Sequence, residues 1–118
     1  MKKLILCLLT IALFNCDDIT EVDDISNENV TVLERADSSV LTIIDINFSW
    51  NAIEDAEQYR LQIATPDFET ATQVVLDTTI VNSNFTQTLE LGSYQWRVRA
   101  ENSEYQTAFT TQSFTVEE

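Results

Sequence analysis

Carboxylates are the side chains of this sequence most able to do chemistry, because 20 of its residues are Asp or Glu and none is His. Glu54 with Asp55, and Glu101 with Glu104, are spaced closely enough to suggest the acid and base of a glycosidase. Both pairs fall in polar stretches that we expect to be exposed loops of a small domain. We therefore interpret them as solvated acidic surface and predict a non-catalytic protein without a metal site or a cofactor.

A single cysteine stands where its thiol has a specific chemistry available. Met1-Lys2-Lys3 is positively charged, and Leu4 to Phe14 is apolar apart from one threonine. A helix over that run would rise only about 16 Å, short of the ~30 Å hydrocarbon core, so it predicts a signal peptide over residues 1–15. The run ends in Leu13-Phe14-Asn15-Cys16, which resembles the lipobox of bacterial lipoproteins. That resemblance implies that Cys16 is acylated and becomes the new N-terminus; an ordinary signal peptide or an uncleaved anchor is the alternative.

The count of cysteines agrees with a lipid anchor. Cys7 lies within the predicted signal peptide, so the mature chain would keep Cys16 alone and could form no internal disulfide. Acyl chains such as palmitate contribute about 0.8 kcal/mol per buried methylene, and two chains hold a soluble domain on a bilayer. We expect a lipoprotein of the cell envelope.

The segment after Cys16 is acidic and shows no sustained period. Asp17 to Asn29 carries six acids and no aromatic residue, so we predict a self-repelling, extended tether over residues 16–29. Its carboxylates lack the turn glycine and the spacing of a calcium loop. The acids directly after the cysteine resemble the export signal of Bacteroidota lipoproteins, which implies the outer membrane, on its cell-surface or its periplasmic face.

Residues 30–117 show the period-two alternation of β-strands and no convincing helical period. The clearest strand covers residues 94–100, with Tyr94, Trp96, Val98 and Ala100 expected to point inward, and Gly92 stands before it, where a turn requires positive φ. A second strand is expected over residues 41–50, a third begins near Tyr59, and the last covers residues 108–116. The side chains expected to point inward on the second and third strands are Ile44, Ile46, Phe48, Trp50, Tyr59, Leu61 and Ile63.

The order of these motifs carries a resemblance. The strand that ends at Trp50, the run Tyr59-Arg-Leu-Gln-Ile and the block Gly92-Ser-Tyr-Gln-Trp-Arg-Val-Arg-Ala-Glu-Asn are similar to those of a fibronectin type III domain, in the form common in Bacteroidota surface proteins. The resemblance covers residues 30–117. It implies a seven-stranded immunoglobulin-like β-sandwich, with strands A, B and E against C, C′, F and G, Trp50 in the core and Tyr94 at the corner before strand F.

Several outward side chains are candidates for binding. Arg60, Arg97 and Arg99 either pair with carboxylates across the strands, which we predict, or form a patch for an anionic ligand. Tyr105 lies in a loop with Asn102 and Glu104, where its ring either stacks on a sugar or a protein, or lies back on the edge of the sandwich. Asp77-Thr78-Thr79 resembles the O-glycosylation site of Bacteroidota.

The function predicted from these features is a lipid-anchored module for protein interaction or accessory binding. The alternative is a carbohydrate-binding accessory subunit of a glycan-uptake system. A nucleic-acid partner is not expected, because a net charge of −14 repels phosphates. The partner, whether an envelope protein or a glycan, is not identified by the sequence.

Overall fold

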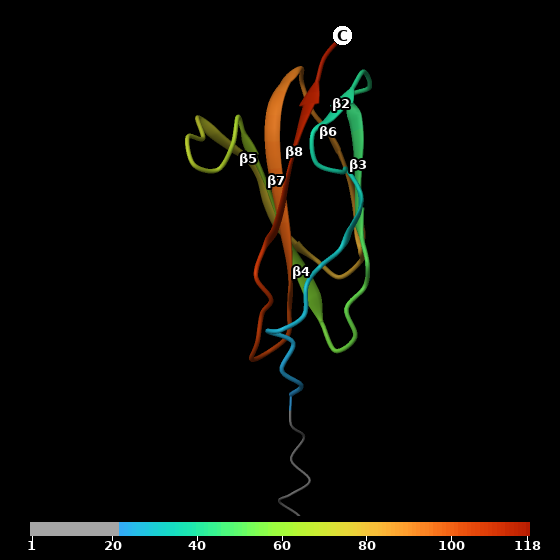
Figure 1. Cartoon of the computed structure of the whole chain (residues 1–118), viewed down its shortest axis with the longest axis vertical. Coiled ribbons are helices and arrows are strands. Elements are labelled where there is room, and N and C mark those ends of the chain that lie inside the picture. Colours follow the sequence, from blue (N-terminus) through green and yellow to red (C-terminus); the bar gives the residue numbers. More distant parts are fainter. Residues whose placement is uncertain (1–21) are drawn as a thin grey trace, which may run out of the picture.

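The computed structural model describes residues 22–118, so the predicted signal peptide and Cys16 lie outside the described residues. The described chain is all-β and folds into an elongated sandwich (Figure 1). Its eight strands are β1 (Val32–Glu34), β2 (Ser39–Leu41), β3 (Asp45–Trp50), β4 (Gln58–Thr65), β5 (Gln73–Ile80), β6 (Asn84–Thr88), β7 (Gly92–Glu101) and β8 (Thr110–Val116).

Two sheets face each other across the core. One has the strand order β1-β3-β6 and the other β2-β8-β7-β4-β5. Strands β1, β3 and β6 occupy the places of A, B and E, and β4, β5, β7 and β8 those of C, C′, F and G, so the predicted all-β sandwich is confirmed. Strand β2, which makes eight strands in place of the predicted seven, was not predicted. It pairs in parallel with β8. Among residues 22–118 there is no helix long and apolar enough to cross a membrane.

The continuous strand predicted over residues 41–50 is wrong in its first part, because the chain changes sheets there. Strand β2 ends at Leu41 in the five-stranded sheet, and β3 begins at Asp45 in the three-stranded sheet. Residues 42–44 cross between the sheets, and Ile44, which was predicted to point inward, is 50% exposed. The alternation that predicted the strand begins only after this crossing.

The core confirms the inward positions predicted for the two tryptophans. Trp50 is 1% exposed and Trp96 is 0% exposed. Phe48 packs between the sheets, with its ring centroid 4.8 Å from that of Trp96. Neither tryptophan is therefore available to a ligand at the surface.

Packing begins before the domain boundary predicted at residue 30. Ile25 is 2% exposed and belongs to the same core cluster as Trp96. The side chain of Asn102 donates a hydrogen bond of 2.9 Å to the carbonyl of Asp23. Asp23 and Ile25 are therefore fastened to the domain, within the stretch 16–29 whose charge predicted an extended tether.

The two ends of the sandwich carry different sets of loops. We call the end at which the described chain enters the near end, and the opposite end, where the chain finishes, the far end (Figure 1). The near end carries loops 51–57, 81–83 and 102–109, and the far end carries loops 42–44, 66–72 and 89–91.

Candidate functional site

The predicted binding loop lies at the near end, and Asn102 organises it. The Oδ1 atom of Asn102 accepts hydrogen bonds from the backbone of Glu104 at 3.0 Å and of Tyr105 at 2.8 Å. Its Nδ2 atom donates to the carbonyls of Asp23 and Asp55 at 2.9 and 3.2 Å. Because these bonds occupy the amide, Asn102 joins three segments of the near end.

Tyr105 and Glu104 sit differently in this loop. Tyr105 is half-buried and packs against the core cluster, whereas Glu104 is exposed. The loop borders a shallow hollow of about 390 Å³, which Arg60 and Arg99 line on the side of the sheet. The structure thus brings the predicted residues together and adds two arginines to them.

Glu101, one of the carboxylates considered as an acid or base, is held by other contacts. Burial raises the pKa of Glu101, but hydrogen bonds from Gln58 and Arg99 outweigh that effect and leave the pKa below its usual value. A general acid at neutral pH needs a raised pKa, so this environment works against such a role. Among residues 22–118 no group of His, Cys, Asp and Glu could hold a metal ion.

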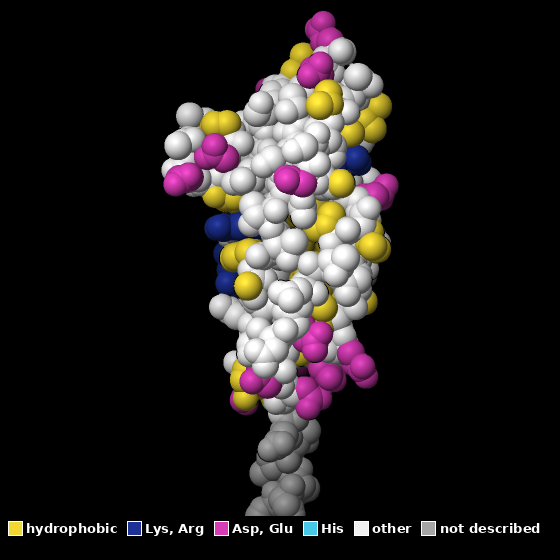
Figure 2. Space-filling view, viewed as in Figure 1, with side chains coloured by type: hydrophobic (Ala, Val, Ile, Leu, Met, Phe, Trp, Pro, Cys, Tyr) yellow, Lys and Arg dark blue, Asp and Glu magenta, His cyan; other side chains and the backbone are white. Residues whose placement is uncertain are grey.

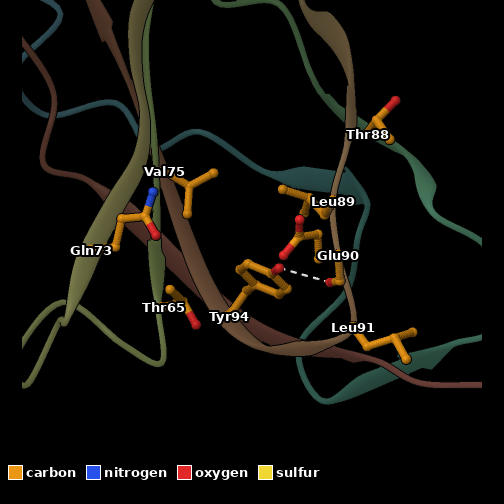
Figure 3. A pocket seen from close by; sticks show the side chains of 8 residues that line it. All are labelled: Thr65, Gln73, Val75, Thr88, Leu89, Glu90, Leu91 and Tyr94. Atoms are coloured by element: carbon orange, nitrogen blue, oxygen red, sulfur yellow. Dashed lines mark hydrogen bonds between the residues drawn. The ribbon is translucent and has the colours of Figure 1, made fainter.

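The far end contains a hollow that the sequence did not indicate. It has a volume of about 430 Å³ and lies between β5 and the turn that leads from β6 to β7. Val75, Leu89 and Tyr94 face one another across it, while the side chains of Thr88 and Leu91 point away (Figure 3). Gln73, Thr65 and Glu90 complete the wall. Its only carboxylate is Glu90, so the hollow suits binding better than acid–base chemistry.

Tyr94 closes the floor of this hollow and confirms the predicted corner. Its hydroxyl donates a hydrogen bond of 2.7 Å to the carbonyl of Glu90 (Figure 3). Burial, together with the charge of Glu90, raises the pKa of the Tyr94 hydroxyl, so the phenol stays protonated. Gly92 has φ of +154°, which confirms the prediction that this turn requires a glycine.

Exposed apolar side chains gather at the same end. Val40, Ile43, Ile44 and Leu91 are between 50% and 61% exposed. The loops that carry them are joined, because the backbone N–H of Leu89 donates a 2.9 Å hydrogen bond to the carbonyl of Ile44. Figure 2 shows hydrophobic side chains at this end with acidic ones beside them. We refer to Val40, Ile43, Ile44 and Leu91 as the far-end apolar surface.

The outward arginines follow the predicted pairing only in part. Arg60 pairs across the strands with Asp77, as predicted, with Nε 2.9 Å from Oδ1. Arg99 pairs with Glu101 of its own strand at 2.8 Å. For Arg97 the prediction is wrong, because the structure shows no ion pair for it with any carboxylate of residues 22–118; its Nε donates to Gln62 Oε1 at 2.7 Å.

Sequence reasoning missed the far end for a physical reason. The hollow is formed by β5, by the turn before β7 and by Thr65, which are distant in sequence and individually ordinary. The sequence did contain one signal of exposed apolar side chains at this end, the pair Ile43-Ile44. It stands directly before a strand in which Ile46 and Phe48 already fill the inward positions. The lipidation site at Cys16 lies outside the described residues.

Solved structures similar to this chain are fibronectin type III domains. A fibronectin(III)-like module of CbhA from Clostridium thermocellum matches with a TM-score of 0.54 and 8% identity, over 75% of this chain and 96% of that one. The crystal structure of FN3tt matches with a TM-score of 0.54 and 15% identity, over 73% and 91%. A domain from human KIAA0970 protein matches with a TM-score of 0.56 and 14% identity, over 85% and 81%. No protein-family model and no curated protein matches the sequence. The likeness shows the fold.

Proposed function

We propose that this chain is a non-catalytic, lipid-anchored protein of the cell envelope that docks a protein partner with the far end of its sandwich. The observation that carries the proposal is the far-end apolar surface, which lies opposite the point where the chain enters the domain. Exposed apolar side chains that gather in one place mark interaction sites in soluble domains. Fibronectin type III-like domains commonly serve in binding, and their loops are a usual place for it.

A lipid on Cys16 would orient the domain. The stretch between Cys16 and Val22 can span at most about 20 Å. The near end, into which Asp23 and Ile25 are fastened, would then face the membrane. The far end, with its hollow and its apolar side chains, would point away from the bilayer and stay accessible to a partner. This orientation favours the far end over the loop of Tyr105 as the docking surface.

The chemistry of the far end specifies the partner. Glu90, Glu117 and Glu118 are exposed beside the apolar side chains, and the chain as a whole carries a net charge of −14. Complementary charge steers association and sets orientation, and an apolar centre supplies most of the affinity. The partner we expect is therefore an envelope protein with an apolar patch bordered by lysine or arginine.

Site-specific crosslinking in cells tests the docking surface. A photoreactive amino acid replaces Ile43 in the full-length protein, and a matched variant carries it at Glu54 of the near end. We expect a defined crosslinked protein from position 43 that disappears when Ile44→Asp is added, and no such product from position 54. The same product from both positions, or one that persists with Ile44→Asp, would show that the far end is not the docking surface.

Metabolic labelling tests the anchor. Labelled palmitate is expected on the wild-type protein and on Cys7→Ser, because Cys7 lies within the predicted signal peptide. The label should be lost in Cys16→Ser, with the protein released from the membrane fraction. Label that persists in Cys16→Ser would refute the anchor, whatever the crosslinking shows.

A further inference from the structure

The positive charge of this acidic protein is concentrated on one face of one sheet. Three of its four arginines, Arg60, Arg97 and Arg99, lie on the outer face of β4 and β7. The strand register places Arg60 directly opposite Arg99. Like charges opposite each other destabilise a sheet unless other groups compensate them. Figure 2 shows several dark blue side chains at the left edge of the molecule, next to hydrophobic ones, and a separate one at the opposite edge.

Two of the three arginines on this face form ion pairs with carboxylates, and the third does not. Asp77 holds Arg60 through two hydrogen bonds, of 2.9 and 3.0 Å. Glu101 holds Arg99. Arg97 has only the neutral amide of Gln62 as a hydrogen-bond acceptor within residues 22–118. Arg97 is therefore the arginine of this face without an ion pair among residues 22–118, although its charge contributes to the lowered pKa of Asp77.

Two aromatic rings fix the position of this guanidinium. Its central carbon lies 4.1 Å from the ring centroid of Phe68 and 4.4 Å from that of Phe109. The loop of Phe68 is itself held on the sheet, since its backbone N–H donates to Gln95 Oε1 at 2.9 Å. Stacking on rings leaves the edge of a guanidinium free to donate, and the Nη atoms of Arg97 make no hydrogen bond to residues 22–118.

The surroundings of Arg97 suit a sugar better than a simple ion. Gln62 and Thr111 lie opposite Arg97 on the two neighbouring strands. Gln95 and Ser113 lie two residues further along, where the Gln95 amide bonds to Phe68 and Ser113. Arg99, two residues along the same face, leads into the 390 Å³ hollow, which the half-buried Tyr105 lines together with Glu101 and Glu104. A sugar ring offers hydroxyls to such amides and an apolar face to an aromatic ring.

We propose that the outer face of the five-stranded sheet binds an acidic sugar, with the carboxylate of a uronic acid accepting hydrogen bonds from the Nη groups of Arg97. A planar carboxylate matches the two parallel donors at the edge of a guanidinium. An oligosaccharide chain held there extends along the strand, from Arg97 past Arg99 toward Tyr105. This inference goes beyond protein docking and does not depend on it, because the residues of the two surfaces are different.

Titration of the full-length protein in detergent with oligogalacturonate tests the proposal. At a salt concentration of about 0.01 M, where screening is weak, we expect measurable binding that weakens as salt is raised. Arg97→Gln should lower the affinity about tenfold, the usual effect of losing a charge-assisted hydrogen-bond pair. Arg97→Lys keeps the charge but not the two parallel donors, so its affinity should lie between those of the wild type and Arg97→Gln. Arg35→Gln is the control, because Arg35 is the remaining arginine and its carbonyl accepts a hydrogen bond from the core residue Trp96, on the inner side of the sheet; this variant should bind like the wild type.

Further probes keep the test independent of how well a variant folds. Methyl-esterified oligogalacturonate, which lacks the carboxylate, should not bind the wild-type protein. Poly-L-glutamate should bind more weakly than oligogalacturonate. The proposal is overturned if the wild type binds no oligogalacturonate at low salt, if Arg97→Gln binds as well as the wild type, or if the esterified sugar binds equally. Equal binding of poly-L-glutamate would overturn the assignment to a sugar. None of these results bears on crosslinking at Ile43.

Discussion

The near and far ends of this sandwich differ in how many polar groups of their loops are hydrogen-bonded within the protein, and in how many apolar side chains their loops expose. At the near end Asn102 forms four hydrogen bonds to three segments, and Ile25 covers the core. At the far end four large apolar side chains are exposed beside a hollow of about 430 Å³, whereas the near-end loops expose one, Val81. A loop whose groups already have partners must break contacts to bind a ligand, whereas an open apolar surface gains contacts. The difference explains why we place protein docking at the far end.

The largest expected effect contrasts two isoleucines, one at each end. Ile25→Ala should destabilise the protein by about 2–4 kcal/mol, because it removes a fully buried side chain from the core. Ile44→Ala, at a side chain that is 50% exposed, should cost less than about 0.5 kcal/mol. Guanidinium unfolding followed by tryptophan fluorescence measures both. A cost for Ile25→Ala as small as that for Ile44→Ala would contradict the packing of residues 22–29 against the domain.

The part of the fold set by local alternation could be predicted, and the part set by contacts across the chain could not. In β7 each inward side chain alternates with a polar one, so Trp96 and Val98 were placed correctly in the core. Ile25 shares an acidic segment with only two other apolar side chains, Ile19 and Val22, and no sustained strand or helix period marks it as buried. Ile44 continues an apparent alternation but falls where the chain crosses between sheets, which only the pairing of β2 with β8 reveals.

A second contrast uses the two tyrosines whose hydroxyls hydrogen-bond to backbone. At the near end Tyr59 accepts a 2.9 Å hydrogen bond from the buried N–H of Ile53, and at the far end Tyr94 donates to the exposed Glu90. Tyr59→Phe should cost about 1–3 kcal/mol, since it leaves a buried donor without a partner. Tyr94→Phe should cost about 0.5–1.5 kcal/mol, because water can reach the freed carbonyl.

The same unfolding measurement checks this order. A larger cost for Tyr94→Phe than for Tyr59→Phe would mean that the far-end turn is more enclosed than the exposure of Glu90 indicates. Circular dichroism of both variants serves as the control for the fold. A docking assay at Ile43 should respond to Tyr94→Phe and not to Tyr59→Phe, because only the first lies beside the far-end apolar surface.

The candidate sites show the same limit of sequence reasoning. Tyr105, Asn102 and Glu104 could be grouped because they are neighbours in one loop, yet the internal bonds of Asn102 depend on Asp23 and Asp55, which are far away in sequence. The alternation of β7 showed that Arg97 points outward. It could not show that Phe68 and Phe109 come from two other loops to flank the guanidinium.

The smallest expected effect concerns the acids of the near end. Desolvation and the neighbouring Asp23 carboxylate raise the pKa of Asp55 above 3.8. The folded state therefore holds this proton more tightly than the unfolded state, and the contribution of Asp55 to stability falls as the pH rises from 3.8 through the raised pKa. Asp55 also has a positive φ of 73°, which asparagine tolerates well. Asp55→Asn should raise the melting temperature at neutral pH by about 1–3 °C.

The pH dependence of that gain, followed by thermal unfolding, separates charge from backbone effects. The gain from Asp55→Asn should shrink as the pH is lowered toward 3.8, where the wild-type carboxyl becomes neutral as well. Asp77→Asn is the control with the opposite sign, because the hydrogen bonds from Arg60 lower the pKa of Asp77. Its stabilising contribution is present above 3.8 and is lost as the pH falls through the lowered pKa, so this variant should melt below the wild type at neutral pH. If Asp55→Asn also melted lower at neutral pH, repulsion of Asp55 by Asp23 would not be what limits the stability of the near end.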